Sequence, residues 1–149
     1  MLAEKNVKKN ELHIKCGILV EKEDKLLLQR NPGESFWSLP GAMLHVGEKY
    51  EEAARRGLLK DTALSVESME LFGMISGRDC FVTTKFGEKA FVLQVYFRST
   101  EYTGKVRIVD DSKREHRFYK RTNLPKNVNP QQKKLIYAWK EESSFPIID

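Results

Sequence analysis

The sequence contains no long hydrophobic run, and this absence limits what the protein can be. Its longest apolar stretches, such as GILV at 17–20 and the leucines within KLLLQ at 25–29, are far shorter than the roughly 20 residues that cross a bilayer. The first 15 residues, MLAEKNVKKNELHIK, are charged and lack the apolar core of a secretory signal. We therefore expect a cytoplasmic protein that does not enter a membrane.

Cysteine is also scarce. The two cysteines, Cys16 and Cys80, lie in apolar, strand-like runs and do not form a CxxC pair, so we expect buried free thiols and no metal or redox motif. The chain has no internal repeat, no low-complexity tract and no linker rich in Pro, Gly or Ser. These absences predict one domain spanning residues 1–149.

Acidic residues are outnumbered, with 21 Asp and Glu against 26 Lys and Arg, which gives a net charge of +5. Such a balance could favour a polyanionic partner. The basic residues are spread over the N-terminus, the 113–121 segment and Lys133–Lys134, without an RNA- or DNA-binding motif around them. A solvated surface explains them, and nucleic acid is not an expected partner, although a salt-dependent nucleic-acid role is a weaker alternative.

The apolar pattern predicts an α/β fold with a mixed sheet packed between helices. Alternating residues indicate two strands within 13–30, around a polar turn at 21–25, and further strands at 36–40, 65–77, 105–111 and 115–120, with a hairpin at 79–99. Helices are expected at 48–61 and at 129–142. The second helix would have Asn129 as its N-cap, Pro130 at its first position and an apolar stripe that includes Trp139 in the core.

The segment 41–64, GAMLHVGEKYEEAARRGLLKDTAL, has the spacing of a catalytic motif. A loop that leads into a helix N-terminus is a natural phosphate site, because unpaired backbone N–H groups point outward there. Positions 57, 60 and 61 project from one helical face, and Glu48 lies just ahead of that helix. Carboxylates at such positions could jointly hold Mg²⁺, which prefers oxygen ligands and commonly bridges to substrate phosphates.

This segment resembles the box of the Nudix (MutT-like) hydrolase family, G-x5-E-x7-R-E-U-x-E-E-x-G-U, in which U is a bulky apolar residue. The match begins at LPGA and runs without a gap, and the resemblance extends over about residues 13–140. It implies an α/β/α sandwich with a mixed central sheet. It also implies hydrolysis of nucleoside diphosphate derivatives with Mg²⁺ or Mn²⁺ as the cofactor, and it allows a homodimer, since dimers are common among similar proteins.

The resemblance assigns roles to four residues. Glu48 and Asp61 match box carboxylates that bind metal, and both are candidate catalytic residues. Arg56 matches the box arginine that orients neighbouring carboxylates, and we include it in the catalytic set. Glu115 lies where relatives often carry an additional metal-binding glutamate, so the candidate metal ligands are Glu48, Asp61 and Glu115.

Two box carboxylates are replaced, by Gly57 and by Lys60, and Ala63 stands in place of a box glycine. Whether the protein is an enzyme therefore stays open at this point. One hypothesis is a metal-dependent pyrophosphohydrolase of nucleoside diphosphate derivatives with a depleted metal site. The alternative is a weakly active or inactive module that binds a nucleotide-like or phosphorylated small molecule.

Three further residues are candidates for substrate binding. Lys60 could replace the metal and contact an anionic ligand directly, or it could pair with Asp61 or Glu48 or extend into water. Trp37 could stack on a base or pack in the core, and Arg30 could contact phosphate or lie on the surface.

Overall fold

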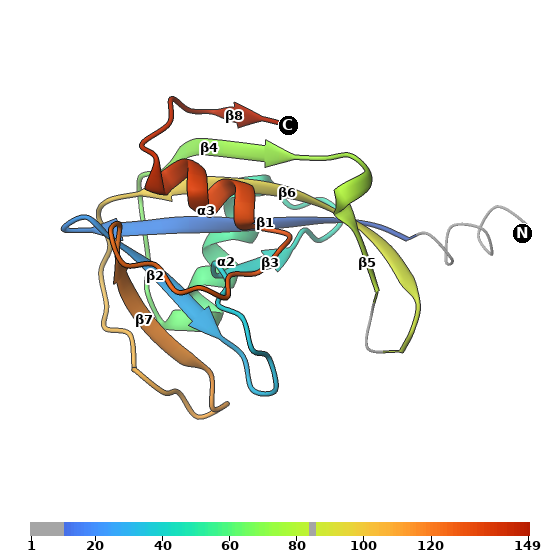
Figure 1. Cartoon of the computed structure of the whole chain (residues 1–149). Helices are drawn as coiled ribbons and strands as arrows, with labels where there is room; N and C mark the ends of the chain where they lie inside the picture. The colour runs from blue at the N-terminus through green and yellow to red at the C-terminus, as the bar shows by residue number, and fades with distance from the viewer. Residues whose placement is uncertain (1–10, 84–85) are drawn as a thin grey trace, which may run out of the picture.

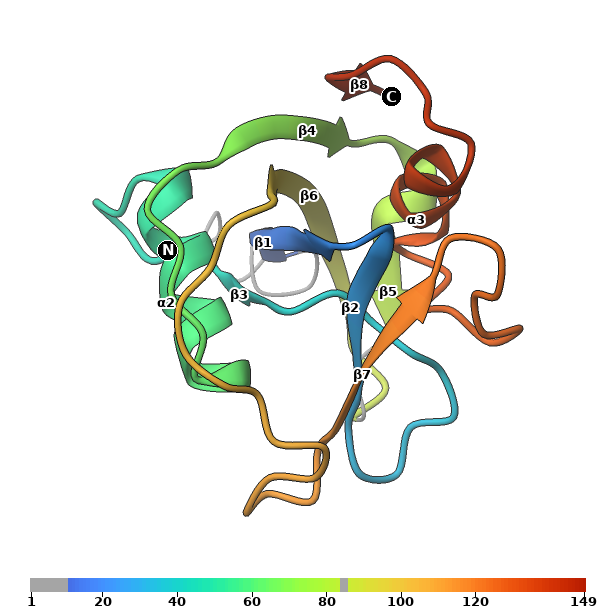
Figure 2. The same ribbon diagram turned by 90° about the vertical axis from the view of Figure 1, so that its left-hand side faces the viewer.

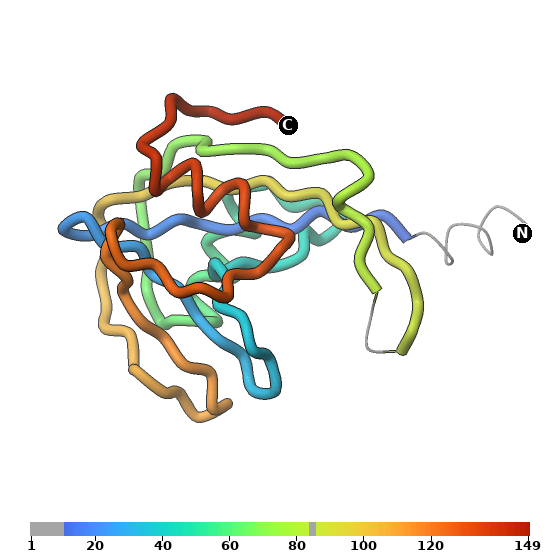
Figure 3. The backbone as a smooth tube through the Cα atoms, viewed as in Figure 1, coloured from blue at the N-terminus to red at the C-terminus, as the bar shows by residue number. Residues whose placement is uncertain are grey.

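A mixed β-sheet organises the fold of the computed structural model, which describes residues 11–83 and 86–149. Its strands follow the order β7-β2-β1-β6-β4-β8, with β3 paired to β1 and β5 paired to β6 (Figure 1). The strands are β1 (Glu11–Lys22), β2 (Lys25–Arg30), β3 (Gly41–Met43), β4 (Glu70–Ile75), β5 (Phe81–Thr83), β6 (Lys89–Ser99), β7 (Glu115–Lys120) and β8 (Ile147–Ile148). The β1–β6 and β4–β8 pairs are parallel and the others antiparallel. The backbone trace shows β1 running through the middle of the molecule (Figure 3).

Helices α2 (Tyr50–Thr62) and α3 (Lys133–Lys140) lie on opposite sides of this sheet (Figure 2). Helix α2 buries Ala53, Ala54 and Leu58 in one apolar cluster, and α3 buries residues in a second cluster on the other face. The architecture is therefore the expected α/β/α sandwich with a mixed central sheet. A short 3-10 turn, η1 (Arg78–Cys80), leads into β5. No helix of the described ranges is long and apolar enough to span a membrane.

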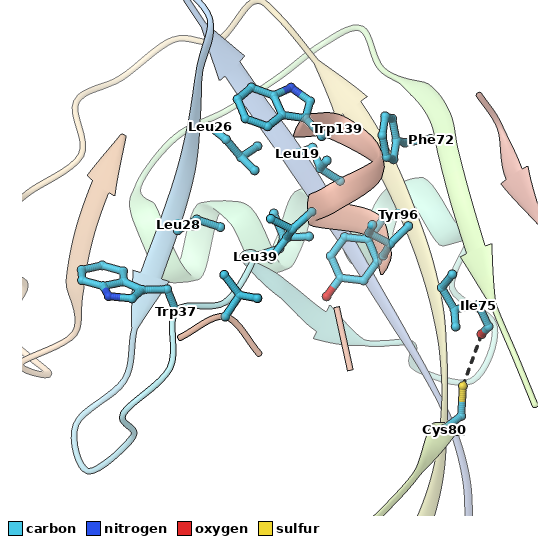
Figure 4. Close-up of a cluster of buried hydrophobic side chains, with 13 residues drawn as sticks. Leu19, Leu26, Leu28, Trp37, Leu39, Phe72, Ile75, Cys80, Tyr96 and Trp139 are labelled. Atoms are coloured by element: carbon cyan, nitrogen blue, oxygen red, sulfur yellow. Dashed lines mark hydrogen bonds between the residues drawn. The ribbon is translucent and has the colours of Figure 1, made fainter. Parts of the chain in front are cut away.

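The cluster beneath α3 joins residues from both halves of the chain (Figure 4). Trp139 belongs to it and is 2% exposed, which confirms that the apolar stripe of the last helix is core packing. Trp37 belongs to the same cluster, and its ring meets that of Tyr119 edge-on at 5.2 Å. Cys16 and Cys80 are both free and buried, as predicted.

A buried glutamine, Gln132, links the segment before β3 to strand β6 within this core. Gln132 is 1% exposed; its Oε1 accepts from the backbone N–H of Leu39 at 2.7 Å, and its Nε2 donates to the hydroxyl of Tyr96 at 2.8 Å. Burial raises the pKa of the Tyr96 phenol, although the hydrogen bond from Gln132 acts against it. This network fixes the chain at Leu39, just before β3 and the box segment.

The last helix is shorter than predicted. Asn129 does not cap it; its Oδ1 accepts from the N–H of Gln131 in a separate turn, and α3 begins at Lys133. The buried hydrogen bond between Gln132 and the Leu39 N–H explains the later start, because the chain turns at Gln132 before the helix begins. Helix α2 matches the prediction closely but begins at Tyr50 and not at Glu48.

Two predicted strands are wrong. Residues 36–40 form only isolated bridges, Gln29 with Ser38 and Trp37 with Val128. Residues 105–111 wrap around a turn, because the side chain of Asp110 accepts from the backbone N–H groups of Ser112 and Arg114. The predicted 79–99 hairpin is present as β5 and β6, although part of its turn lies outside the described residues. Of the predicted strand at 65–77, residues 70–75 form β4, and its pairing with β6 is irregular between Leu71 and Gly73.

Candidate active site

The loop before α2 is closed by reciprocal hydrogen bonds. Glu48 accepts from the N–H of His45 at 3.0 Å, and the Glu48 N–H donates to the His45 carbonyl at the same distance. Glu52 accepts from the N–H of Lys49 at 3.2 Å, which satisfies a free donor at the start of the helix. At the other end Ala63 adopts a left-handed conformation with φ of 66°. A glycine is favoured there, as the box pattern also has it.

Glu48 and Arg56 form a two-pronged ion pair. Arg56 Nε donates to Glu48 Oε2 at 2.8 Å, and Arg56 Nη2 donates to Oε1 at 2.9 Å and to the carbonyl of Met43 at 2.7 Å. The hydrogen bonds from Arg56, with that from His45, hold the pKa of Glu48 at about 2. Glu48 is therefore ionised at neutral pH, with both oxygens already occupied by donors. The arginine braces this carboxylate and the loop together.

Asp61 lies at the other end of α2 among donors. Its Oδ2 accepts from Gln29 Nε2 at 2.9 Å and from the N–H of Gly41 at 3.4 Å, while Oδ1 lies 3.6 Å from Arg114 Nη1. Lys15 is close enough that the charge of Asp61 acts on it; burial lowers the pKa of Lys15, and Asp61 opposes that change. Asp61 thus sits in a cationic environment.

Glu115 and Asp61 face opposite sides of the sheet. Side chains alternate along β7, so Glu115 faces the side of α3 and the next residue, His116, faces the side of α2. Glu115 accepts from Arg30 at 2.8 and 3.0 Å, and the Arg30 guanidinium lies 4.8 Å from the centre of the Trp37 ring. The structure therefore places Arg30, Trp37 and Glu115 together, away from the other candidates.

A cavity of about 480 Å³ opens between the end of α2 and the 105–114 segment. Lys60 and Asp61 line it from the helix, and His116 lines it from β7. The remaining lining residues are Leu59, Thr62, Ala63, Lys105, Arg107, Asp110, Asp111, Ser112 and Arg114. Sequence reasoning missed Lys105, Arg107, Arg114 and His116 as site residues, although it noted that the 113–121 segment is basic.

The NUDIX domain family model matches residues 11–139, and this chain belongs to that family. An ADP-ribose pyrophosphatase of Methanocaldococcus jannaschii is 28% identical over 149 residues, covering 94% of this chain and 84% of the relative. A MutT NUDIX hydrolase from Burkholderia pseudomallei has a similar fold, with a TM-score of 0.71 and 18% identity over 86% of this chain and 98% of its own. A UDP-X diphosphatase gives a TM-score of 0.69 at 14% identity, over 99% and 74% of the two chains.

Nudix proteins typically use a divalent metal, but the residues present here do not form a site that fits one. Within residues 11–83 and 86–149, no three His, Cys, Asp or Glu side chains are grouped so that they could hold a metal ion. Glu48 is paired with Arg56, Asp61 with Gln29 and Arg114, and Glu115 with Arg30. This distribution separates the three carboxylates proposed from the sequence, and cations or amide donors take the places next to them.

Proposed function

We propose that this protein is a pyrophosphohydrolase that acts on a nucleoside diphosphate derivative, with ADP-ribose as the first compound to test. Family membership and the named relative support the substrate class. The observation that carries the proposal is the cavity at the end of the box helix, which is large enough for a phosphorylated ligand. Four basic residues line it, Lys60, Lys105, Arg107 and Arg114, against three carboxylates, Asp61, Asp110 and Asp111.

Hydrolysis would add one water across the diphosphate linkage and would give a nucleoside monophosphate and a second phosphorylated product. The chain's own residues would neutralise the phosphates and hold them in place. The Glu48–Arg56 pair would act as a positioning element, because it ties the loop after β3 to the middle of α2. Of the carboxylates that the sequence singled out, Asp61 is the one that lines the cavity.

A second candidate function is binding without turnover. It is favoured by the arginine partners of Glu48, Asp61 and Glu115 and by Lys60 in place of a box carboxylate. In that case the protein would sense or carry the ligand. Family membership does not decide between the two functions, because activity depends on the site and not on the fold.

The test is release of nucleoside monophosphate from ADP-ribose, other nucleoside diphosphate sugars, dinucleoside polyphosphates and nucleoside triphosphates, with Mg²⁺, Mn²⁺ or EDTA. Glu48→Gln is the site variant, and Glu51→Gln, an exposed glutamate in the first turn of the same helix, is the matched control. Turnover lost in Glu48→Gln and kept in Glu51→Gln would support hydrolysis. Ligand binding without turnover under every metal condition would replace it with the binding function.

A further inference from the structure

Two buried polar atoms on the cavity side of the sheet have no hydrogen-bond partner among residues 11–83 and 86–149. They are Oε1 of Gln29, which is 4% exposed, and Nε2 of His116, which is 3% exposed. Such atoms are rare in native structures, because a buried polar atom that loses its hydrogen bonds to water and gains none is destabilising. Each therefore points to a group that arrives from outside the chain.

The two residues are direct neighbours across β2 and β7, so their side chains share one face. Their backbones bond elsewhere: Gln29 exchanges both hydrogen bonds with Ser38, and the His116 N–H donates to the carbonyl of Ile108. The pair is thus of the non-hydrogen-bonded kind, in which opposite side chains lie closest. His116 lines the cavity, whereas Gln29 does not line it and supports it from behind, because its Nε2 donates to the lining residue Asp61.

The chemistry of the two unpaired atoms is defined by their other contacts. His116 Nδ1 lies 2.9 Å from the carbonyl of Arg107, which can only accept, so Nδ1 carries the proton. In the tautomer with its single proton on Nδ1, Nε2 is an acceptor. Gln29 uses its amide N–H for Asp61, so its Oε1 is an acceptor as well. Among these two atoms, only His116 Nε2 belongs to a residue that lines the cavity, and as an acceptor it suits a ligand with O–H or N–H groups.

The rim of the cavity has the opposite character. Arg107 pairs with Asp111 at 3.3 Å, and Arg114 lies between Asp110 and Asp61 at 3.5 and 3.6 Å. Lys60 and Lys105 have no ion pair with any residue of the described part of the chain. Two lysines therefore remain available for an anion at the entrance.

We propose that this cavity binds a nucleoside diphosphate derivative without a divalent metal, with Lys60 and Lys105 holding the phosphates and with His116 accepting from a sugar hydroxyl or a base amino group. This inference rests on the proposed ligand class and names the residues that recognise it. It assigns to side-chain cations the charge neutralisation that a metal supplies in other family members. The acceptor at His116 favours a ligand that carries a sugar or a base, and inorganic pyrophosphate has neither.

Calorimetric titration of the full chain tests the site, with ADP-ribose and inorganic pyrophosphate as probes, in Mg²⁺ or in EDTA. We expect ADP-ribose to bind equally well in both. His116→Phe should weaken ADP-ribose binding about 10-fold and leave pyrophosphate binding unchanged, which also shows that the variant is folded. His13→Phe, at a half-buried position in β1 outside the cavity, is the matched control.

The exposed lysines provide a second test with little risk to folding. Lys60→Met with Lys105→Met should weaken both probes, while Lys133→Met should weaken neither. Binding of ADP-ribose that is lost in EDTA, or an unchanged affinity in His116→Phe, would overturn the inference even if metal-dependent hydrolysis established the proposed function. Binding in EDTA without hydrolysis would support the inference and remove the hydrolase function.

Discussion

Gly57 in α2 lies directly against the backbone of Gly41 in β3. A Cβ atom at position 57 would be 2.4 Å from the carbonyl carbon of Gly41 and 2.6 Å from the nitrogen of Ala42. Real Cβ atoms do not approach that closely, so the glycine permits the contact between helix and strand. The same contact brings the Gly41 N–H within 3.4 Å of Asp61. A side chain at position 57 would therefore disturb the site as well as the packing.

We expect Gly57→Ala to lower the free energy of unfolding by about 1–3 kcal/mol, because it overpacks a closed contact. The sign is informative, since the same change on an open helix face would raise stability by roughly 1 kcal/mol. Denaturant unfolding of Gly57→Ala beside Glu51→Ala, on the exposed face, measures it. A more stable Gly57→Ala variant would show that β3 does not pack as described.

Ala63→Gly should stabilise the protein by about 0.5–1 kcal/mol. The alanine pays the steric cost of a left-handed backbone, and glycine removes that cost while adding some freedom to the unfolded chain. For a domain of this size the melting temperature should rise by about 1–4 °C. Gly104→Ala is the complementary change and should destabilise, because Gly104 has a φ of +102° and a Cβ there would lie 2.8 Å from the carbonyl of Ala63.

The ion pair of Glu48 and Arg56 should make stability depend on pH at the acid end. The folded protein holds the pKa of Glu48 at about 2, and an unfolded glutamate titrates near 4.3. Between these values the unfolded state binds a proton that the folded state does not, so stability is full above about pH 5 and falls towards pH 2. Unfolding of the wild type and of Glu48→Gln across this range should show a shallower fall in the variant. If the free energy of unfolding fell equally steeply with pH in both proteins, Glu48 would not contribute to the acid dependence of stability.

Loss of Gln132 should destabilise the core more than loss of its partner hydroxyl. Gln132→Leu leaves the buried N–H of Leu39 and the Tyr96 hydroxyl without partners, and we expect a cost of about 2–3 kcal/mol. Tyr96→Phe leaves one buried donor, Gln132 Nε2, without its acceptor, and we expect a smaller cost of about 1–2 kcal/mol. The double variant should cost less than the sum, since the two residues share a bond. If the destabilisation of the double variant equalled the sum of the two single variants, the hydrogen bond between Gln132 and Tyr96 would contribute nothing to stability.

Much of the fold could be predicted because its signals are local. The apolar stripe of α3, the box helix and the hairpin of β5 and β6 all follow from periodicities within one segment. The 105–111 segment was misassigned because its β-branched residues look like a strand, whereas the structure leaves Ile108 and Val109 exposed. The hydrogen bonds to the Asp110 side chain favour a turn over a strand, and an apolar pattern does not reveal such side-chain bonds.

The candidate site was less predictable because it depends on contacts between distant segments. The spacing of the box predicts roles for Glu48, Arg56 and Asp61, but it cannot show that Arg114 reaches Asp61. Glu115 stays a predicted metal ligand by its position in the chain. Because side chains alternate along β7, the neighbouring residue His116 lines the cavity and Glu115 does not.

The central place of β1 also sets the order in which the molecule can be completed. β1 pairs with β6 over its length, from Glu11 opposite Ala90 to Val20 opposite Ser99 (Figure 3). β1 therefore cannot form this pairing until the chain has been made as far as β6, and such distant pairings form slowly. Gln29, Asp61 and His116 likewise meet only after β7 has been made. Ligand binding at the cavity would thus report that synthesis has passed β7 and that the segments around the cavity have folded.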